Sequence, residues 1–124
     1  MGLCALVGVG QGDTPEDAAW LAEKVVAARV FEDDAGKMNR SLLDVRGELL
    51  AISQFTLLGD LRKGRRPSFN LALEPESAVG LFEAFCHHCR RSVPVRTGRF
   101  RARMRVSLMN EGPVTLLIDS KKAF

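Results

Sequence analysis

An apolar segment at residues 3–9, followed at once by the signals of a helix start, limits the fold more than any other feature. Its seven residues, Leu-Cys-Ala-Leu-Val-Gly-Val, are typical of a short strand covered on both faces. Thr14 then supplies an N-cap hydroxyl and Pro15 the favoured first residue of a helix, so a helix is predicted over residues 15–28. A strand that leads into a helix indicates a layered structure of both element types.

The rest of the chain continues this mixture of strands and helices. A second helix is predicted to begin near Pro75, because the apolar residues of 78–89 share one face at helical spacing. Residues 48–57 are the longest strand candidate, and residues 102–108 alternate apolar side chains with arginines, as a half-buried strand does. The other predicted elements are a short strand at 29–32, a hairpin turn at 33–37 and a last strand at 114–118. Together they predict an α/β fold, a mixed β-sheet with two helices.

Length and composition narrow the class of protein. A chain of 124 residues has no room for a second hydrophobic core, so residues 1–124 are predicted to form a single domain. Three cysteines are too few for a disulfide scaffold, and no apolar run reaches the roughly 18 residues of a membrane span. The first twelve residues lack the basic start of a signal peptide. We therefore expect a cytoplasmic protein without a membrane partner.

Positive charge is concentrated in two segments, although the net charge is only +3. Seven arginines lie within residues 90–105, which contain no acid. Four further cations lie within five consecutive residues, namely Arg62, Lys63, Arg65 and Arg66. Because arginines commonly hold phosphate groups, this distribution predicts a polyanionic partner, with solubilising surface charge as the alternative.

Two motifs look like ligand sites, but their residues favour structural roles. The glycines at positions 8, 10 and 12 precede a helix, as in a dinucleotide-binding loop, yet Asp13 would repel a phosphate there. The sequence Cys-His-His-Cys at 86–89 lies within the second predicted helix, where consecutive residues point about 100° apart and cannot surround one zinc ion. Both cysteines fall on the apolar face, where a thiol packs as a small hydrophobe. We therefore predict neither a metal nor a cofactor.

Two other segments carry candidate functional residues. Ser53, Gln54 and Thr56 interrupt the longest strand with polar side chains. A hydroxyl nucleophile requires an adjacent base, and the only two histidines lie side by side in the second helix, so ordinary strand residues with one polar face remain the alternative. Gly112-Pro113 stands between two predicted strands, either as an ordinary turn or as a cis peptide bond that serves a defined geometry.

Three motifs taken together closely resemble those of the D-aminoacyl-tRNA deacylases, the chirality-proofreading enzymes of bacteria and eukaryotes. They are SQFTL at residues 53–57, RKGRRPSF at 62–69 and NEGPVT at 110–115, in the family's order and at roughly its spacing. The likeness extends over residues 2–120. It implies a homodimer of single-domain α/β subunits that hydrolyses the ester of D-aminoacyl-tRNA, with active sites at the dimer interface and no metal or cofactor.

The resemblance also implies roles for individual residues. Main-chain N–H groups at Ser53, Gln54 and Phe55 bind the substrate and form an oxyanion hole, and the substrate's own 2′-hydroxyl helps to activate water. Thr56 is the alternative, a side-chain nucleophile. Each subunit inserts Gly112-Pro113, in the cis form, into its partner's pocket, where main-chain carbonyl groups exclude L-amino acids.

Further implied positions complete the site. Phe69 and Met104 fall in matching motifs and are implied as walls of the substrate pocket. The loop at 62–66 and the arginine row at 101–105 are candidates for contacts with acceptor-stem phosphates of tRNA. The loop cations are those named above, namely Arg62, Lys63, Arg65 and Arg66.

The chain departs from the family pattern at its N-terminus, at two internal positions and at its C-terminus. Family members begin one strand and one hairpin ahead of the segment that matches Gly2, so the domain is expected to be truncated at its N-terminus. Arg101 replaces a glycine, Leu61 replaces a threonine, and residues 121–124 extend past the usual end. Because a missing strand would expose a sheet edge, a catalytically inactive tRNA-binding homodimer is the alternative function.

Overall fold

Helix α1 (Pro15–Ala27) begins at a capped turn, as its sequence predicts. In the computed structural model, which describes residues 1–124, the Asp17 N–H donates to the Thr14 hydroxyl and the Asp17 carboxylate accepts the Thr14 N–H. This reciprocal capping box satisfies two N–H groups that the helix cannot. The buried side of α1 consists of small residues, namely Ala18, Ala22 and Val26, which allow a second helix to approach closely.

Helix α2 (Pro75–Arg90) also begins where predicted and packs against α1. Phe85, Cys86 and Cys89 are at most 2% exposed and belong to the core between the helices and the sheet. The prediction that both cysteines pack as core residues is therefore confirmed. Burial raises the pKa of the Cys89 thiol to about 12, so this thiol stays protonated and unreactive at neutral pH.

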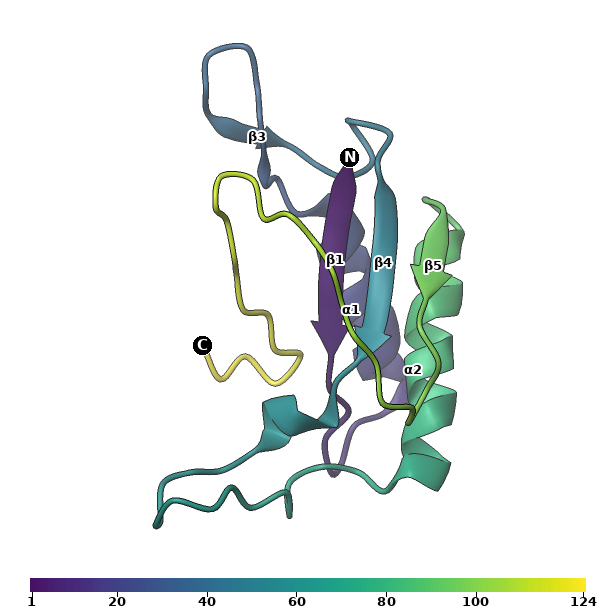
Figure 1. Ribbon diagram of the computed structural model, residues 1–124. Coiled ribbons are helices and arrows are strands. Elements are labelled where there is room, and N and C mark those ends of the chain that lie inside the picture. Colours follow the sequence, from purple (N-terminus) through teal and green to yellow (C-terminus); the bar gives the residue numbers. More distant parts are fainter.

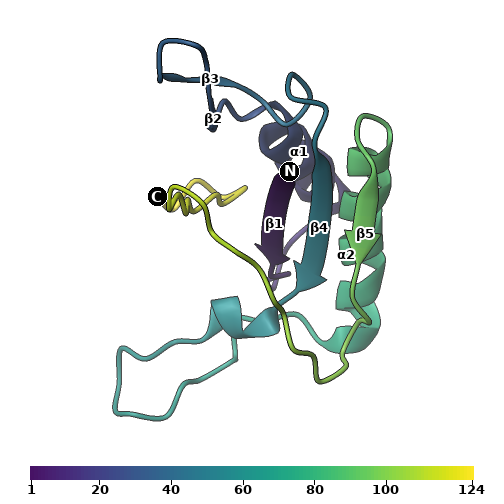
Figure 2. The same cartoon turned by 45° about the horizontal axis from the view of Figure 1, so that its top comes forward.

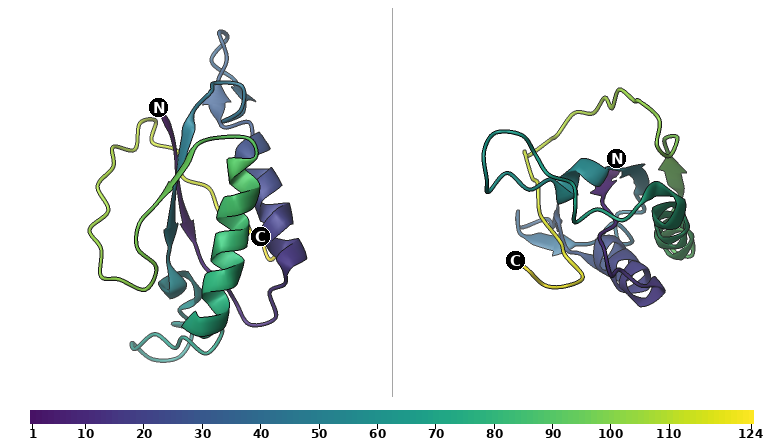
Figure 3. Two further views of the ribbon diagram at one scale, coloured as in Figure 1. Left: turned by 90° about the vertical axis from the view of Figure 1, so that its right-hand side faces the viewer. Right: turned by 90° about the horizontal axis from the view of Figure 1, so that it is seen from below.

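Three parallel strands form the main sheet, in the order β1 (Gly2–Val7), β4 (Glu48–Ser53) and β5 (Val95–Thr97). β1 and β4 are paired along their whole length. Both helices cover one face of this sheet, as Figure 1 and the left panel of Figure 3 show. This arrangement confirms the predicted α/β fold with two helices.

The other face of the sheet is open, so the prediction of a first strand covered on both faces is wrong. Leu6 of β1 lies on this face and is 48% exposed. The segment that crosses this side is residues 102–118, which we call the arm, and it arches over the sheet on the side away from the helices (Figures 1 and 2). The open face lacks the apolar cover that a continuous apolar strand normally has.

The arm contains no strand, although the sequence predicts strands at 102–108 and 114–118. No backbone–backbone hydrogen bond involves residues 103–118. A strand exists only where a neighbour pairs with its N–H and C=O groups, and no strand lies beside the arm. The predicted alternation holds only at the start of the arm, where Ala102 and Met104 are half-buried between exposed arginines. Val106 and Leu108, which were predicted on the same buried side, are exposed.

β4 ends at Ser53, so the strand predicted over residues 48–57 is too long. Its partner β1 ends at Val7, opposite Ser53, and residues 9–11 pair instead with residues 71–73. Without a partner strand the chain turns, and residues beyond Gln54 form the 3-10 helix η1 (Phe55–Leu58).

A small antiparallel pair completes the fold. It consists of β2 (Phe31–Glu32) and β3 (Met38–Arg40), so the strand predicted at 29–32 is shorter than expected. The predicted hairpin turn is confirmed, since the Asp33 carboxylate accepts the N–H groups of Ala35 and Lys37. Neither helix has the length and apolar character that crossing a bilayer would require.

Candidate active site

The residues from Ser53 to Thr56 join the end of β4 to the first residues of η1, and we call this segment the site turn. The N–H of Gln54 donates to the Val7 carbonyl at 2.8 Å and thereby closes the pairing of β1 with β4. This N–H cannot also face a substrate, so the candidate main-chain donors for an oxyanion are those of Ser53 and Phe55. Phe55 and Thr56 are exposed, which leaves the turn accessible from solvent.

The Thr56 hydroxyl has no base beside it. Its oxygen accepts a hydrogen bond from the side-chain amide of Gln54, and no carboxylate or imidazole bonds to it. Both histidines belong to α2, as the sequence predicts. A nucleophilic hydroxyl needs a proton acceptor, so this geometry favours main-chain chemistry over a Thr56 nucleophile.

Phe69 lies against the site turn. Its ring contacts that of Phe55 edge to face, with centroids 5.1 Å apart and planes at 65°. Gly59 makes room for this ring, because a Cβ at Gly59 would lie 3.1 Å from Phe69 Cε1. The structure thus brings together the two motifs at 53–57 and 62–69.

Met104, the other candidate pocket wall, lies near the end of β4. Its Sδ accepts the N–H of Arg99 at 3.4 Å. A Cβ on Gly98 would overlap this sulfur and would lie 3.4 Å from Ile52 Cδ1. Met104 therefore packs over Gly98 beside Ile52, one residue before the site turn begins.

Gly112 and Pro113 form the tip of the arm, and the peptide bond between them is cis. Gly112 has φ +139°, a conformation that favours glycine. Asn110 closes the tip, because its side-chain amide donates to the Thr115 hydroxyl at 2.9 Å and its carbonyl oxygen accepts the Val114 N–H at 3.2 Å. The motif at 110–115 is thus a closed turn.

The structure does not bring this tip to the site turn of the same chain. Figure 1 and the left panel of Figure 3 both place the bend of the arm near the start of β1. The site turn follows the end of β4, and β4 runs parallel to β1. The two motifs implied as one site therefore lie at opposite ends of the sheet within one chain.

The loop at residues 60–68 carries the four predicted phosphate-binding cations. Asp60 and Ser68 close it through two N–H···O bonds of 2.7 and 2.9 Å. Arg62 folds back onto Asp60 with contacts of 2.8 and 2.9 Å, which lower the pKa of the Asp60 carboxyl to about 2. The remaining cations are exposed and have no ion pair in the chain, namely Lys63, Arg65 and Arg66.

Arg101 pairs with a carboxylate of helix α2. Its guanidinium lies 3.5 Å from a carboxylate oxygen of Glu76 in α2. Its φ of +64° lies in the left-handed region, where glycine is the favoured residue. This conformation gives a physical reason for the glycine that the resemblance places at this position.

A groove of about 530 Å³ lies beside η1. The sequence motifs did not point to Leu58 or Leu71, which line it, because an apolar residue in a sequence normally indicates the core. Leu61, where the resemblance leads one to expect a threonine, also lines the groove. The complete lining is Leu57, Leu58, Gly59, Asp60, Leu61, Arg62 and Leu71.

The glycine loop at 8–12 packs against the site turn. A Cβ on Gly8 would lie 2.5 Å from Leu58 Cδ2 and 3.2 Å from the Gln54 carbonyl oxygen. The Gly10 N–H donates to the Asp13 carboxylate at 2.8 Å. These glycines allow two segments of the chain to approach closely, which agrees with the structural role predicted for them.

Comparison with known proteins identifies the family. A family model described as D-Tyr-tRNA(Tyr) deacylase matches residues 1–119. The chain belongs to this deacylase family. A D-aminoacyl-tRNA deacylase of Thermosipho africanus is 56% identical over 124 residues, covering 99% of this chain and 83% of that protein. The protein of the same name from Thermus aquaticus is 58% identical over 122 residues, covering 98% of this chain and 80% of that protein.

One solved structure has the same fold. The c-Myc DNA unwinding element binding protein superposes on this deacylase with a TM-score of 0.86 at 37% identity, covering 93% of this chain and 79% of that one. The fold and the family resemblance inferred from the three motifs are therefore confirmed.

Proposed function

We propose that this deacylase hydrolyses the ester bond of D-aminoacyl-tRNA, for example D-tyrosyl-tRNA, and releases the free D-amino acid and tRNA. The observation that carries this function is the match of the deacylase family to residues 1–119. Relatives that are more than half identical to this chain over the aligned residues are named for the same reaction. These relatives do not favour the alternative of an inactive tRNA-binding homodimer. Residues 1–124 act as one domain, in the cytoplasm, where aminoacyl-tRNA is consumed.

The site turn provides the chemistry. Water attacks the ester carbonyl, and the N–H groups of Ser53 and Phe55 stabilise the oxyanion that develops. The 2′-hydroxyl of the substrate's terminal ribose activates the water, since Thr56 has no base beside it. The bond to the ribose oxygen then breaks. All groups required belong to the main chain, the water or the substrate, so no metal or cofactor takes part.

Two copies of the chain build each active site. The tip of the arm lies at the end of the sheet opposite to its own site turn, so a second copy is the source of the tip that reaches this turn. The open face and the arm expose large apolar side chains that a partner subunit would cover. They are Leu6, Val106, Leu108, Leu116, Leu117 and Ile118.

The tip selects the chirality of the substrate. In the dimer, Gly112 and Pro113 enter the partner's pocket, whose walls are Phe69 and Met104. Main-chain carbonyl groups of the tip then occupy the space that the side chain of an L-amino acid would need.

The loop at 60–68 binds the tRNA backbone. Lys63, Arg65 and Arg66 contact phosphates of the acceptor stem, since they are exposed and unpaired within the chain. Arg62 contributes less, because a phosphate would have to displace the carboxylate of Asp60.

Deacylation of D-tyrosyl-tRNA and of L-tyrosyl-tRNA, each compared with spontaneous hydrolysis, tests the function. We expect rapid loss of the D-ester alone. A folded protein that leaves both esters intact would overturn the proposed activity. If such a protein still bound tRNA with strong salt dependence, the inactive binding protein would be the correct alternative.

A further inference from the structure

A hollow of about 560 Å³ lies at the end of the sheet where β4 and β5 begin. It is formed by the last turn of α2, the connection from α2 to β5 and the first residue of β4. Three arginines line it against a single acid, so its wall has a net positive charge. We call it the arginine hollow, and its polar lining consists of Glu48, Arg90, Arg91, Ser92 and Arg96.

The backbone that carries these side chains is fixed on both sides. The N–H of Val93 donates to the Cys89 carbonyl at 3.0 Å, and the N–H of Leu49 in β4 donates to the Pro94 carbonyl at 2.9 Å. Cys89 and Val93 are also buried in the core. An anion that binds here therefore has only side chains to order, which keeps the entropic cost of binding small.

The cations of the arginine hollow are weakly paired within the chain. Arg90 and Arg91 are exposed and form no ion pair. Arg96 lies 3.8 Å from Glu48, but the two side chains are 83% and 56% exposed, so water screens this contact. The dipole of α2 favours a cation in its last turn, yet it does not explain an arginine of β5 in the same hollow.

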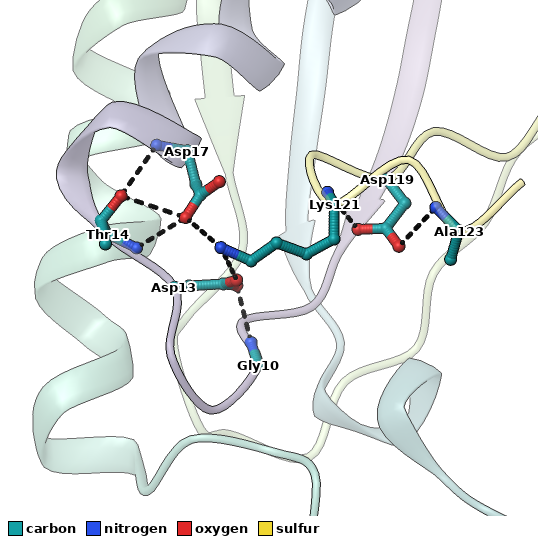
Figure 4. Close-up of polar contacts among 7 residues, drawn as sticks. All are labelled: Gly10, Asp13, Thr14, Asp17, Asp119, Lys121 and Ala123. Atoms are coloured by element: carbon teal, nitrogen blue, oxygen red, sulfur yellow. Dashed lines mark hydrogen bonds and ion pairs between the residues drawn. The ribbon is translucent and has the colours of Figure 1, made fainter.

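A firmly paired cation elsewhere in the chain shows the difference. The Nζ of Lys121 lies 2.7 Å from an oxygen of Asp17 and 3.9 Å from an oxygen of Asp13, and Figure 4 shows its side chain directed at these carboxylates. A phosphate could bind Lys121 only by displacing them. The guanidinium groups of Arg90 and Arg91 have no carboxylate to displace, and each offers a planar fork of N–H donors that matches two phosphate oxygens.

The arginine hollow and the basic loop at 60–68 lie at opposite ends of one chain. The hollow lies at the start of β4, whereas the loop comes after the site turn, which begins at the end of β4. β4 has six residues, and at a rise of about 3.3 Å per residue it is about 20 Å long. Figure 1 shows the start of β4 beside the N-terminus and the loop beyond the other end of the sheet.

The proposed dimer brings these two basic regions together. The tip at 112–113 lies near the start of β1, which pairs with the start of β4, so the tip and the arginine hollow share one end of the sheet. That tip reaches the partner's site turn in the dimer. The end of one subunit that carries the hollow therefore meets the end of its partner that carries the site turn and the loop.

We propose that the arginine hollow of one subunit binds backbone phosphates of the tRNA whose aminoacyl end occupies the partner's site turn. This inference rests on the proposed function and on the dimer that it requires. The loop at 60–68 of one subunit and the hollow of the other then hold the same tRNA. Phosphate contacts fix the position of a nucleic acid without reading its bases, so the hollow adds affinity and orientation but no preference among tRNA sequences.

The first experiment measures how the binding of deacylated tRNA depends on salt. Arg90→Gln/Arg91→Gln removes two charges from the hollow, and Arg29→Gln/Lys37→Gln removes two exposed, unpaired charges from other segments as the matched control. We expect the hollow variant alone to reduce the slope of log K against log salt, by about 1–2. Equal slopes in the two variants would overturn the inference, because the hollow would then have no effect beyond overall charge.

Hydrolysis separates a phosphate contact from damage to the site turn. The hollow variant should raise KM for D-tyrosyl-tRNA and leave kcat at the parent value, because the hollow contacts a part of the tRNA that does not react. D-tyrosyl-adenosine carries the same ester without a phosphate, so its kcat/KM should not change. A fall in that value would overturn the inferred phosphate contact. A parent protein that binds tRNA but cleaves neither ester would refute the proposed function, while the salt dependence would still test the hollow.

Mixed dimers test which subunit supplies the contact. One subunit carries Arg90→Gln/Arg91→Gln, the other carries Arg65→Gln/Arg66→Gln, and two different affinity tags isolate the mixed species. If the hollow acts across the interface, one site loses both sets of cations and the other keeps both, so half of the sites bind tRNA with the parent affinity. If it acts within one chain, every site loses one set. The absence of sites with the parent affinity would overturn the cross-subunit arrangement.

Discussion

Replacing Gly8 by alanine should damage the site turn more than the fold. The new Cβ would lie 2.5 Å from Leu58 Cδ2, 3.2 Å from the Gln54 carbonyl oxygen and 3.3 Å from Leu57 Cβ. The Leu58 side chain can rotate away, but the other two atoms move only if the backbone of the turn shifts by a few tenths of an ångström. Overpacking of this kind costs about 1–3 kcal/mol of folding free energy.

The loss of activity should exceed what this stability change explains. The shifted backbone carries the N–H groups proposed to stabilise the oxyanion, and displacements below 1 Å reduce rates strongly, so we expect an about tenfold fall in kcat for D-tyrosyl-tRNA. The assay is single-turnover deacylation at a temperature where circular dichroism shows the variant to be folded.

Gly80→Ala is the matched control for this experiment. Gly80 lies in α2, and a Cβ there meets no atom within 4 Å. Alanine in a helix interior should stabilise the protein by about 0.5–1 kcal/mol and leave kcat unchanged. If Gly8→Ala left kcat at the parent value in a folded protein, the assignment of the site turn as the catalytic element would be refuted.

The other predictions concern the tip and the basic loop. Asn110→Ala removes both hydrogen bonds that close the tip and should lower the ratio of D-ester to L-ester hydrolysis. Thermal unfolding should show a loss of at most about 1.5 kcal/mol per bond. An unchanged hydrolysis ratio would contradict the role of the tip. Arg65→Ala should reduce the salt dependence of tRNA binding by about one phosphate contact, and Arg62→Ala should reduce it less because Arg62 is paired with Asp60. Filter binding at several salt concentrations measures both effects. Equal effects would contradict the pairing of Arg62 with Asp60. The Asp60 carboxyl should titrate near pH 2 in ¹³C NMR. Because its pKa is lower in the folded protein than in the unfolded chain, its contribution to stability is complete above the ordinary carboxyl range and is lost as the pH falls through about 2. A titration near pH 4 would show that the Asp60–Arg62 pair is not formed in solution.

Features that depend on one segment could be predicted from the sequence. The starts of α1 and α2 follow from Pro15 and Pro75 and from the apolar spacing behind them. The alternation in the arm predicted the half-buried positions of Ala102 and Met104, but not the exposure of Val106 and Leu108. The core position of Cys89 followed from the face of the helix on which it lies.

Features that depend on the contact of two segments could not be predicted from the sequence. β4 ends at Ser53 because β1 ends opposite it, and the sequence of β4 contains no trace of that limit. The arm has the pattern of a strand but lacks a neighbour to pair with. The position of the tip relative to its own site turn also required the structure, which places the two motifs at opposite ends of the sheet. The resemblance had implied only that the tip enters a partner's pocket.

A site made from main-chain atoms has an unusual pattern of mutational tolerance. Every amino acid except proline offers the same N–H group, so many substitutions at Ser53 or Phe55 preserve the proposed donors. The vulnerable positions are those that shape the backbone around them, such as Gly8 and Gly59, where a single methyl group would press on the main chain of the site turn. In this enzyme, evolutionary constraint should therefore fall on residues that never touch the substrate.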